Sequence, residues 1–152
     1  MSDYHDDIPI DLARAAHRGT SFVPDDRARQ ERDGYASQLA ADLANLSRYA
    51  TTDEKRAILA EEFARYREGF RSRYVAHLAA KSRCMSTMIT GRSNFPVRQQ
   101  EKRGSVADKR CAELLDFRTR ALKAIERKLR PEIALWSVAE DRRNVYVEPG
   151  GA

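Results

Sequence analysis

Apolar residues recur at spacings of three and four along most of this chain, which is the period of an amphipathic α-helix. The first run follows Pro24 and two acidic residues, a favourable helix start. The second follows Thr51 and Glu54, which match a capping box, and the third continues to Arg130. We find no convincing strand pattern. The sequence therefore predicts an all-α protein with main helices over about 25–49, 52–83 and 96–130.

Glycine and proline residues divide the second half of this pattern. Pro96 keeps the preceding Phe95 out of the helical conformation, so we expect a fixed turn at 91–96, with Gly91 ending the second helix. Gly104 is expected to interrupt the third helix, which would restart at a capping signal in 105–108. The predicted architecture is an elongated three-helix bundle.

A chain of 152 residues has room for one domain. Residues 1–23 show no helical period, so we interpret them as an extended or partly ordered arm. The helical domain is expected to cover 24–139, and a loose tail is expected at 140–152, where Pro149 and two glycines end the chain.

Charge is distributed unevenly along the sequence. Residues 1–61 carry a net charge of −4, residues 62–130 carry +11 and residues 131–152 carry −2, within an overall formal charge of +5. No carboxylate occurs between Glu68 and Glu101. Solvated helices ordinarily interleave both signs, so this stretch predicts a basic surface that suits an anionic partner.

Composition makes it unlikely that this sequence belongs to several classes of protein. No apolar run approaches the roughly 18 to 20 residues that cross a bilayer, and the acidic N-terminus lacks the apolar stretch of a secretory signal. Two cysteines, Cys84 and Cys111, are too few for a disulfide framework or for a zinc site of their own. We therefore expect a cytoplasmic protein without a membrane partner.

The sequence gives little support for catalysis. Cys84 has basic neighbours, but His77 lies two helical turns away, about 10 Å, so we interpret the two as a structural cysteine and an interfacial histidine. The acidic segment 4–7, with Asp11 and His17, holds metal-ligand types without a helical ligand spacing, and we interpret it as a solvated arm. No nucleotide-binding, hydrolase or metalloprotease motif is present. We expect no enzyme activity, no cofactor and no metal.

The segment 82–98 differs from the rest because it combines five Ser and Thr hydroxyls, three arginines and no acid. Hydroxyls, guanidinium groups and free N–H groups at a helix start are the groups that bind phosphate oxygens. Met85, Met88 and Phe95 are interpreted as core residues beneath the turn. The predicted binding residues for nucleic acid or an acidic partner are Arg71, Arg73, Lys81, Arg83, Arg92, Ser93, Arg98, Lys102 and Arg103.

The same segment resembles one found in small accessory proteins of phages and plasmids. It reads Ser-Arg-Cys-Met-Ser-x-Met-Ile-Thr-Gly from residue 82, followed by Phe-Pro-Val-Arg from residue 95. The upstream segments 19–22 and 27–35 are similar to the same group. The resemblance implies an origin in a mobile element, where DNA-handling and anti-defence proteins are common, and it supplies no catalytic residues.

The leading hypothesis from the sequence is a non-enzymatic binding protein whose basic central surface engages nucleic acid or a nucleic-acid-handling host complex, such as an anti-CRISPR-like inhibitor. A second hypothesis is an assembly protein, for example a homodimer, because the second helix carries small residues at Gly69, Ser72 and Ala76 beside its apolar stripe. A third is a helical DNA-binding regulator with a helix-turn-helix unit within 89–103. The sequence leaves open whether the partner is DNA, RNA or an acidic protein surface.

Overall fold

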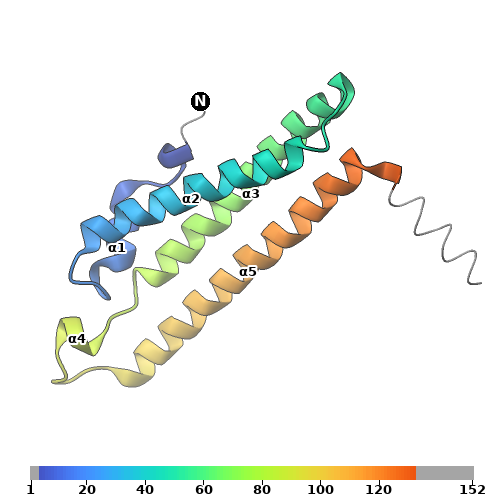
Figure 1. Cartoon of the computed structure of the whole chain (residues 1–152). Helices are drawn as coiled ribbons and strands as arrows, with labels where there is room; N and C mark the ends of the chain where they lie inside the picture. Colours follow the sequence, from blue (N-terminus) through green and yellow to red (C-terminus); the bar gives the residue numbers. More distant parts are fainter. Residues whose placement is uncertain (1–3, 133–152) are drawn as a thin grey trace, which may run out of the picture.

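The regular structure of the described residues is entirely helical, which confirms the predicted all-α class. The computed structural model describes residues 4–132 (Figure 1). The helices are the 3-10 helix η1 (Tyr4–Asp7), α1 (Ile10–Arg18), α2 (Pro24–Ser47), α3 (Asp53–Lys81), α4 (Thr87–Thr90) and α5 (Val97–Leu129).

The long helix α3 lies at the centre of the fold. It packs along α5, which runs back beside it, while α1 packs against both α2 and α3 (Figure 1). The loop between α1 and α2 lies at the same end of the molecule as α4 (Figure 1). The helix α1, which was not expected from the sequence, thus adds a fourth packed element to the three long helices.

A row of aromatic rings along α3 forms the middle of the core. Phe63, Tyr66, Phe70 and Tyr74 follow one another at spacings of three and four, with ring centroids 5.5 to 5.8 Å apart. Tyr35 of α2 stacks on Phe70 with centroids 5.5 Å apart. Such rings combine a large buried apolar area with favourable edge-to-face and offset-stacked contacts, so they hold α2 and α3 together.

The expectation of an extended arm at 1–23 is wrong for the described part of that segment. Residues 4–7 and 10–18 are helical, and Ile8, Ala13 and Ala16 are almost completely buried. The inward face of α1 carries Ala13, Ala16 and His17, with Ile10 and Leu12 partly buried against the core, but its apolar period extends over only nine residues, which is short for recognition from sequence. The tail expected at 140–152 lies outside the described residues, as do residues 133–139 of the expected helical domain.

Three predicted helix boundaries also need correction. Helix α5 passes through Gly104 without a break, since its packing on α3 outweighs the cost of about 1 kcal/mol for one helical glycine. Helix α3 ends at Lys81, and Gly91, with φ of +83°, caps the short α4 instead. The cap at the start of α3 is Thr52, whose side chain accepts a hydrogen bond from the backbone N–H of Lys55.

Candidate nucleic-acid interface

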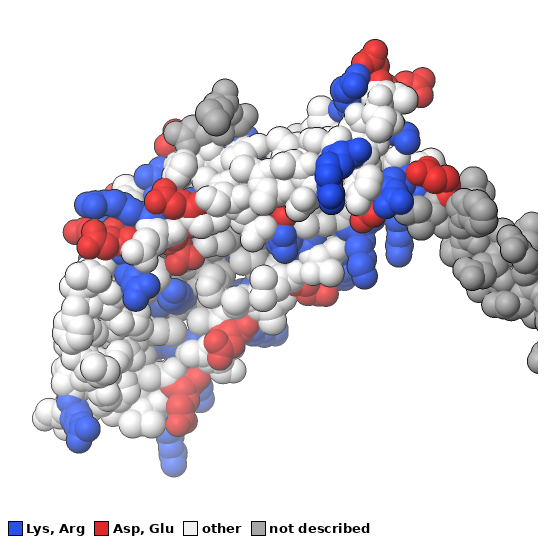
Figure 2. Space-filling view, in the orientation of Figure 1, with Lys and Arg blue, Asp and Glu red and all other residues white. Residues whose placement is uncertain are grey.

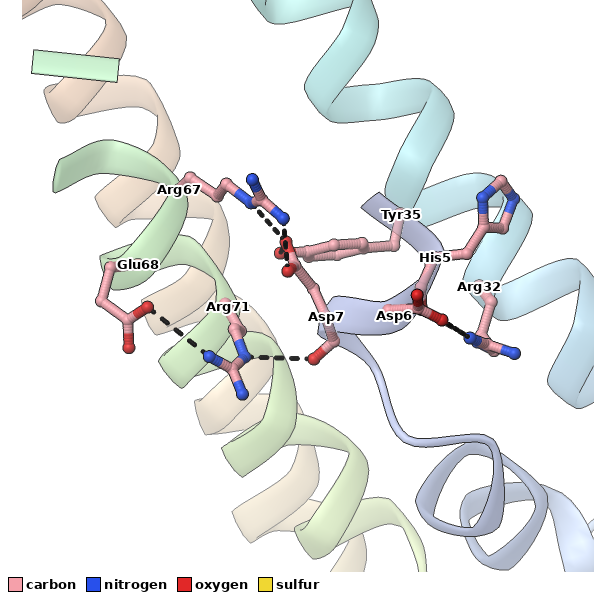
Figure 3. A network of polar contacts seen from close by, with 8 residues as sticks. All are labelled: His5, Asp6, Asp7, Arg32, Tyr35, Arg67, Glu68 and Arg71. Carbon is pink, nitrogen blue, oxygen red and sulfur yellow. Dashed lines mark hydrogen bonds and ion pairs between the residues drawn. The ribbon is translucent and has the colours of Figure 1, made fainter. Parts of the chain in front are cut away.

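Several cations of the basic middle region pair with carboxylates of the acidic N-terminal region, among them Arg67, Lys81 and Arg118. Arg67 of α3 donates two hydrogen bonds of 2.7 Å to the carboxylate of Asp7, which also accepts one from Tyr35 at 3.0 Å (Figure 3). The guanidinium of Arg67 also lies over the ring of Tyr4. Part of the charge separation in the sequence is therefore neutralised inside the fold.

A second buried carboxylate joins the three long helices. Asp42 of α2 is only 2% exposed and accepts hydrogen bonds from Tyr66 of α3 at 2.6 Å and from Gln38 at 3.1 Å. Arg118 of α5 donates two more, from Nε at 3.1 Å and from a terminal nitrogen at 2.5 Å. The two oxygens of Asp42 are thus fully engaged in a network that fixes the position of α5.

A third carboxylate, Glu31, accepts hydrogen bonds from Tyr74 and from His17, the latter at 2.8 Å, and pairs with Lys81 at 3.9 Å. Burial alone would raise the pKa of Glu31, but the hydrogen bonds from Tyr74 and His17 lower it overall. These groups, with Arg27 and Gly34, line an open cleft of about 340 Å³ between α1, α2 and α3.

Asp7 and Glu31 make stability depend on pH. Burial would raise the pKa of Asp7 as well, yet hydrogen bonds from Arg67 and Tyr35 lower it below its usual range. A group with a lower pKa in the folded state contributes stability above its unfolded pKa and loses it as the pH falls through the folded value. We expect urea denaturation to give constant stability from about pH 7 to pH 5 and a decline below about pH 4.

The variant that tests this pH dependence is Asp7→Asn combined with Glu31→Gln. It should be less stable at neutral pH and should lose less stability on acidification than the parent chain. An equally steep decline in the variant would show that other carboxylates cause the acid sensitivity.

Four of the nine predicted binding residues are engaged within the fold. Arg71 donates to the backbone oxygen of Asp7 at 3.1 Å and pairs with Glu68, as Figure 3 shows. Arg73 lies 3.9 Å over the ring of Phe117. Lys81 pairs with Glu31, as described above, and Arg103 donates to the backbone oxygen of Arg83 at 3.1 Å. The charges of Arg71 and Lys81 are partly neutralised by carboxylates, and the side chains of Arg73 and Arg103 are held in contacts within the fold.

The other five predicted residues remain available to a partner. Within the described part of the chain, their side chains make no ion pair or hydrogen bond, and all five residues are exposed: Arg83, Arg92, Ser93, Arg98 and Lys102. They lie in one part of the molecule, which we call the α4 end and define as residues 83–102 together with the adjacent loop 19–23. In the view of Figure 2, both charges alternate over the body, whereas the end that contains α4 is largely uncharged, with cations and an acidic side chain at its margin.

Hydrogen bonds donated by backbone N–H groups hold the three segments of the α4 end together. The N–H of Ser86 donates to the carbonyl oxygen of Gly19 at 2.8 Å, across 67 residues of sequence. The N–H of Met85 donates to the side-chain oxygen of Gln100 in the first turn of α5, also at 2.8 Å. Ser86 in addition caps α4 by accepting from the N–H of Met88. The segment around α4 is therefore held to the loop 19–23 and to the start of α5.

The expectation that Met85 and Met88 fill the core is wrong. Met88 is 77% exposed and Met85 is 45% exposed, while Phe95 is partly buried. Phe22 and Val23 of the adjacent loop are exposed as well. The loop 19–23 was not predicted as part of the site, because contacts between residues far apart in sequence, such as the hydrogen bond from Ser86 to Gly19, place it there.

The structure also describes the surroundings of the other candidate groups. Burial, followed by the negative charge of Asp108, raises the pKa of the Cys84 thiol, so the reactive thiolate is disfavoured at neutral pH. His77 lies with Nδ1 3.3 Å from the backbone oxygen of Ala107. Within residues 4–132, no group of three His, Cys, Asp or Glu side chains is placed to hold a metal ion.

The structure also bears on the two sequence features that suggested an assembly protein and a helical DNA-binding regulator. The ring of Phe117 in α5 packs directly on Gly69, so this part of the small-residue face of α3 receives a helix of the same chain, while Ser72 is exposed. Helix α4 has only four residues, which is short for the first helix of a helix-turn-helix unit.

A scan against protein-family models, a search of curated proteins and a search of solved structures each found no match. None of the helices in the described part of the chain combines the length and apolarity needed to cross a membrane.

Proposed function

We propose that this chain is a non-enzymatic, cytoplasmic protein of a mobile element whose α4 end engages nucleic acid, either free or within a host nucleoprotein complex. One observation carries the proposal. Arg83, Arg92, Arg98 and Lys102 are exposed without a carboxylate partner among the described residues, and they lie within 20 residues of one another. Cations such as Arg67 and Arg118 are paired, while Lys109, Lys123 and Arg127, also exposed without such a partner, are spread further along α5. Unpaired cations grouped at one end form the kind of footprint that neutralises phosphates.

The local chemistry of the α4 end suits phosphate oxygens. Guanidinium groups bind phosphate through two parallel hydrogen bonds, and the exposed hydroxyls of Thr87 and Ser93 add further donors. Helix α5 begins here with no acidic residue in its first turn, so the positive end of its dipole is not neutralised locally.

The resemblance to small phage and plasmid accessory proteins makes an inhibitor of a host defence complex, of the anti-CRISPR kind, one concrete form of this function. Such a protein would compete for guide or target nucleic acid. Mimicry of DNA is not part of the proposal, because a DNA mimic presents a strongly acidic surface and the α4 end is basic.

The test replaces Arg83, Arg92 and Arg98 together with alanine. We expect the affinity for DNA or RNA, measured by fluorescence anisotropy, to fall by about tenfold or more. The slope of log affinity against log salt should become shallower by up to about 0.9 for each phosphate that the variant no longer neutralises. Circular dichroism should show an unchanged helical fold, since none of the three side chains makes a hydrogen bond or ion pair within the described structure.

A matched control replaces three exposed arginines that are paired with carboxylates elsewhere on the surface, namely Arg56, Arg65 and Arg120. It removes the same charge and should change affinity much less. Binding that is insensitive to salt, an equal loss in the control, or no binding to any nucleic acid would each overturn the proposal.

A further inference from the structure

Exposed apolar side chains gather at the α4 end beside its unpaired arginines. Of the eight large apolar residues that are exposed in the described part of the chain, five belong to the α4 end. Phe22 is 74% exposed and Met88 is 77% exposed. The five residues are Phe22, Val23, Met85, Met88 and Val97.

These residues come from three segments that the structure joins. The hydrogen bond from Ser86 to Gly19 places the loop 19–23 against the segment before α4, and the bond from Met85 to Gln100 joins that segment to the start of α5. Of the cations of the same end, Arg92 follows α4 by two residues and Arg98 is the second residue of α5. The α4 end therefore exposes apolar side chains and unpaired cations on neighbouring segments, where one partner could contact both.

Duplex nucleic acid could contact the cations of this surface but not its apolar side chains. Its phosphates lie outside, but the apolar faces of its bases are stacked inside the helix and cannot cover exposed side chains. An unpaired strand offers both groups at once, because its bases can stack on an aromatic ring or a guanidinium plane while its phosphates bind cations. Methionine is flexible and polarisable, so Met85 and Met88 can adapt to a flat base.

We infer that the α4 end binds unpaired, single-stranded nucleic acid, with Phe22 and Met88 contacting bases and Arg92 and Arg98 contacting phosphates. This inference rests on the proposed function and specifies its substrate class. An acidic protein segment with apolar side chains is the competing occupant. The segment 69–100 favours a nucleic acid because it combines arginines with phosphate-binding hydroxyls and contains no carboxylate.

The test measures the affinity of the whole chain for four probes by fluorescence anisotropy. They are a thymidine strand of about 15 nucleotides, an abasic strand and a duplex of the same length, and an acidic peptide of glutamate and leucine. The abasic strand keeps the phosphates and removes the bases. We expect the thymidine strand to bind about tenfold more tightly than the abasic strand, as base stacking predicts.

The variant Phe22→Ala with Met88→Ala should abolish this difference and leave the affinity for the abasic strand unchanged. Leu115→Ala is the matched control, since Leu115 is exposed on α5 about 27 Å along the helix from Val97. A preference for bases that survives the double variant would overturn the assignment to this surface.

The remaining outcomes separate this inference from the proposed function. Equal affinity for the thymidine strand, the abasic strand and the duplex would overturn the inference and leave the phosphate-binding function standing. Tight binding of the acidic peptide without binding of any nucleic acid would overturn both and assign the α4 end to a protein partner.

Discussion

Replacing Asp42 with alanine is expected to lower the free energy of unfolding by about 3 kcal/mol, measured by urea denaturation. The substitution leaves the charge of Arg118 and the hydroxyl of Tyr66 without their acceptor, and Tyr66 is almost completely buried. Breaking a buried ion pair from one side costs about 3 to 5 kcal/mol. We expect the lower end of that range because the side chain of Arg118 is 29% exposed and can be partly hydrated.

Two variants test whether the cost comes from this network. Asp116→Ala removes an exposed carboxylate that pairs with Arg120 on the same helix, and it should change stability by less than about 0.5 kcal/mol. Adding Arg118→Leu and Tyr66→Phe to Asp42→Leu replaces the network with apolar groups and should recover much of the loss. A loss from Asp42→Ala no larger than that from Asp116→Ala would contradict the role assigned to Asp42.

The long helices were predictable because their large apolar residues carry the period directly. Tyr66, Phe70 and Tyr74 recur at helical spacing and form the aromatic row of the core. The predicted helix 25–49 corresponds to α2, and 52–83 corresponds to α3 with differences of one or two residues at its ends. Local sequence determines such elements because their amphipathic pattern repeats over many turns.

Helix α1 and the course of α5 could not be read in the same way. The apolar period of α1 extends over only nine residues, and the burial of Ala13 and Ala16 depends on contact with α2 and α3. Gly104 and the residues after it suggest a helix boundary locally, whereas packing along α3 keeps α5 continuous. In both cases the tertiary contact decides the structure.

The sequence narrowed the candidate site to one region but could not show which cations are available. Arg71 and Arg92 lie in the same carboxylate-free stretch, yet Arg71 contacts Asp7, 64 residues away in sequence. Arg92 has no such contact within the described residues. Pairing over this separation depends on how α3 packs beside η1. The net charge of a sequence region therefore overestimates how many of its cations are available to a partner.

Substitution of Gly19 by alanine is expected to loosen the α4 end and lower the free energy of unfolding by about 2 kcal/mol. A Cβ atom at this position would overlap the backbone carbonyl oxygen of Cys84, which is part of the main chain and cannot rotate away. The segments must separate, which lengthens or breaks the hydrogen bond from Ser86 to Gly19. Hydrogen exchange should become faster at the N–H of Ser86 while the N–H groups in the middle of α3 stay protected.

The matched control is Gly34→Ala, because a Cβ atom at Gly34 meets no atom within 4 Å. That substitution in an exposed helix should raise stability by up to about 1 kcal/mol. If the loop 19–23 and the segment around α4 bind a strand together, Gly19→Ala should also weaken binding of the thymidine strand, and Gly34→Ala should not. Unchanged exchange at Ser86 in Gly19→Ala would contradict the close approach, and unchanged strand binding despite faster exchange would show that the arginines act without the loop.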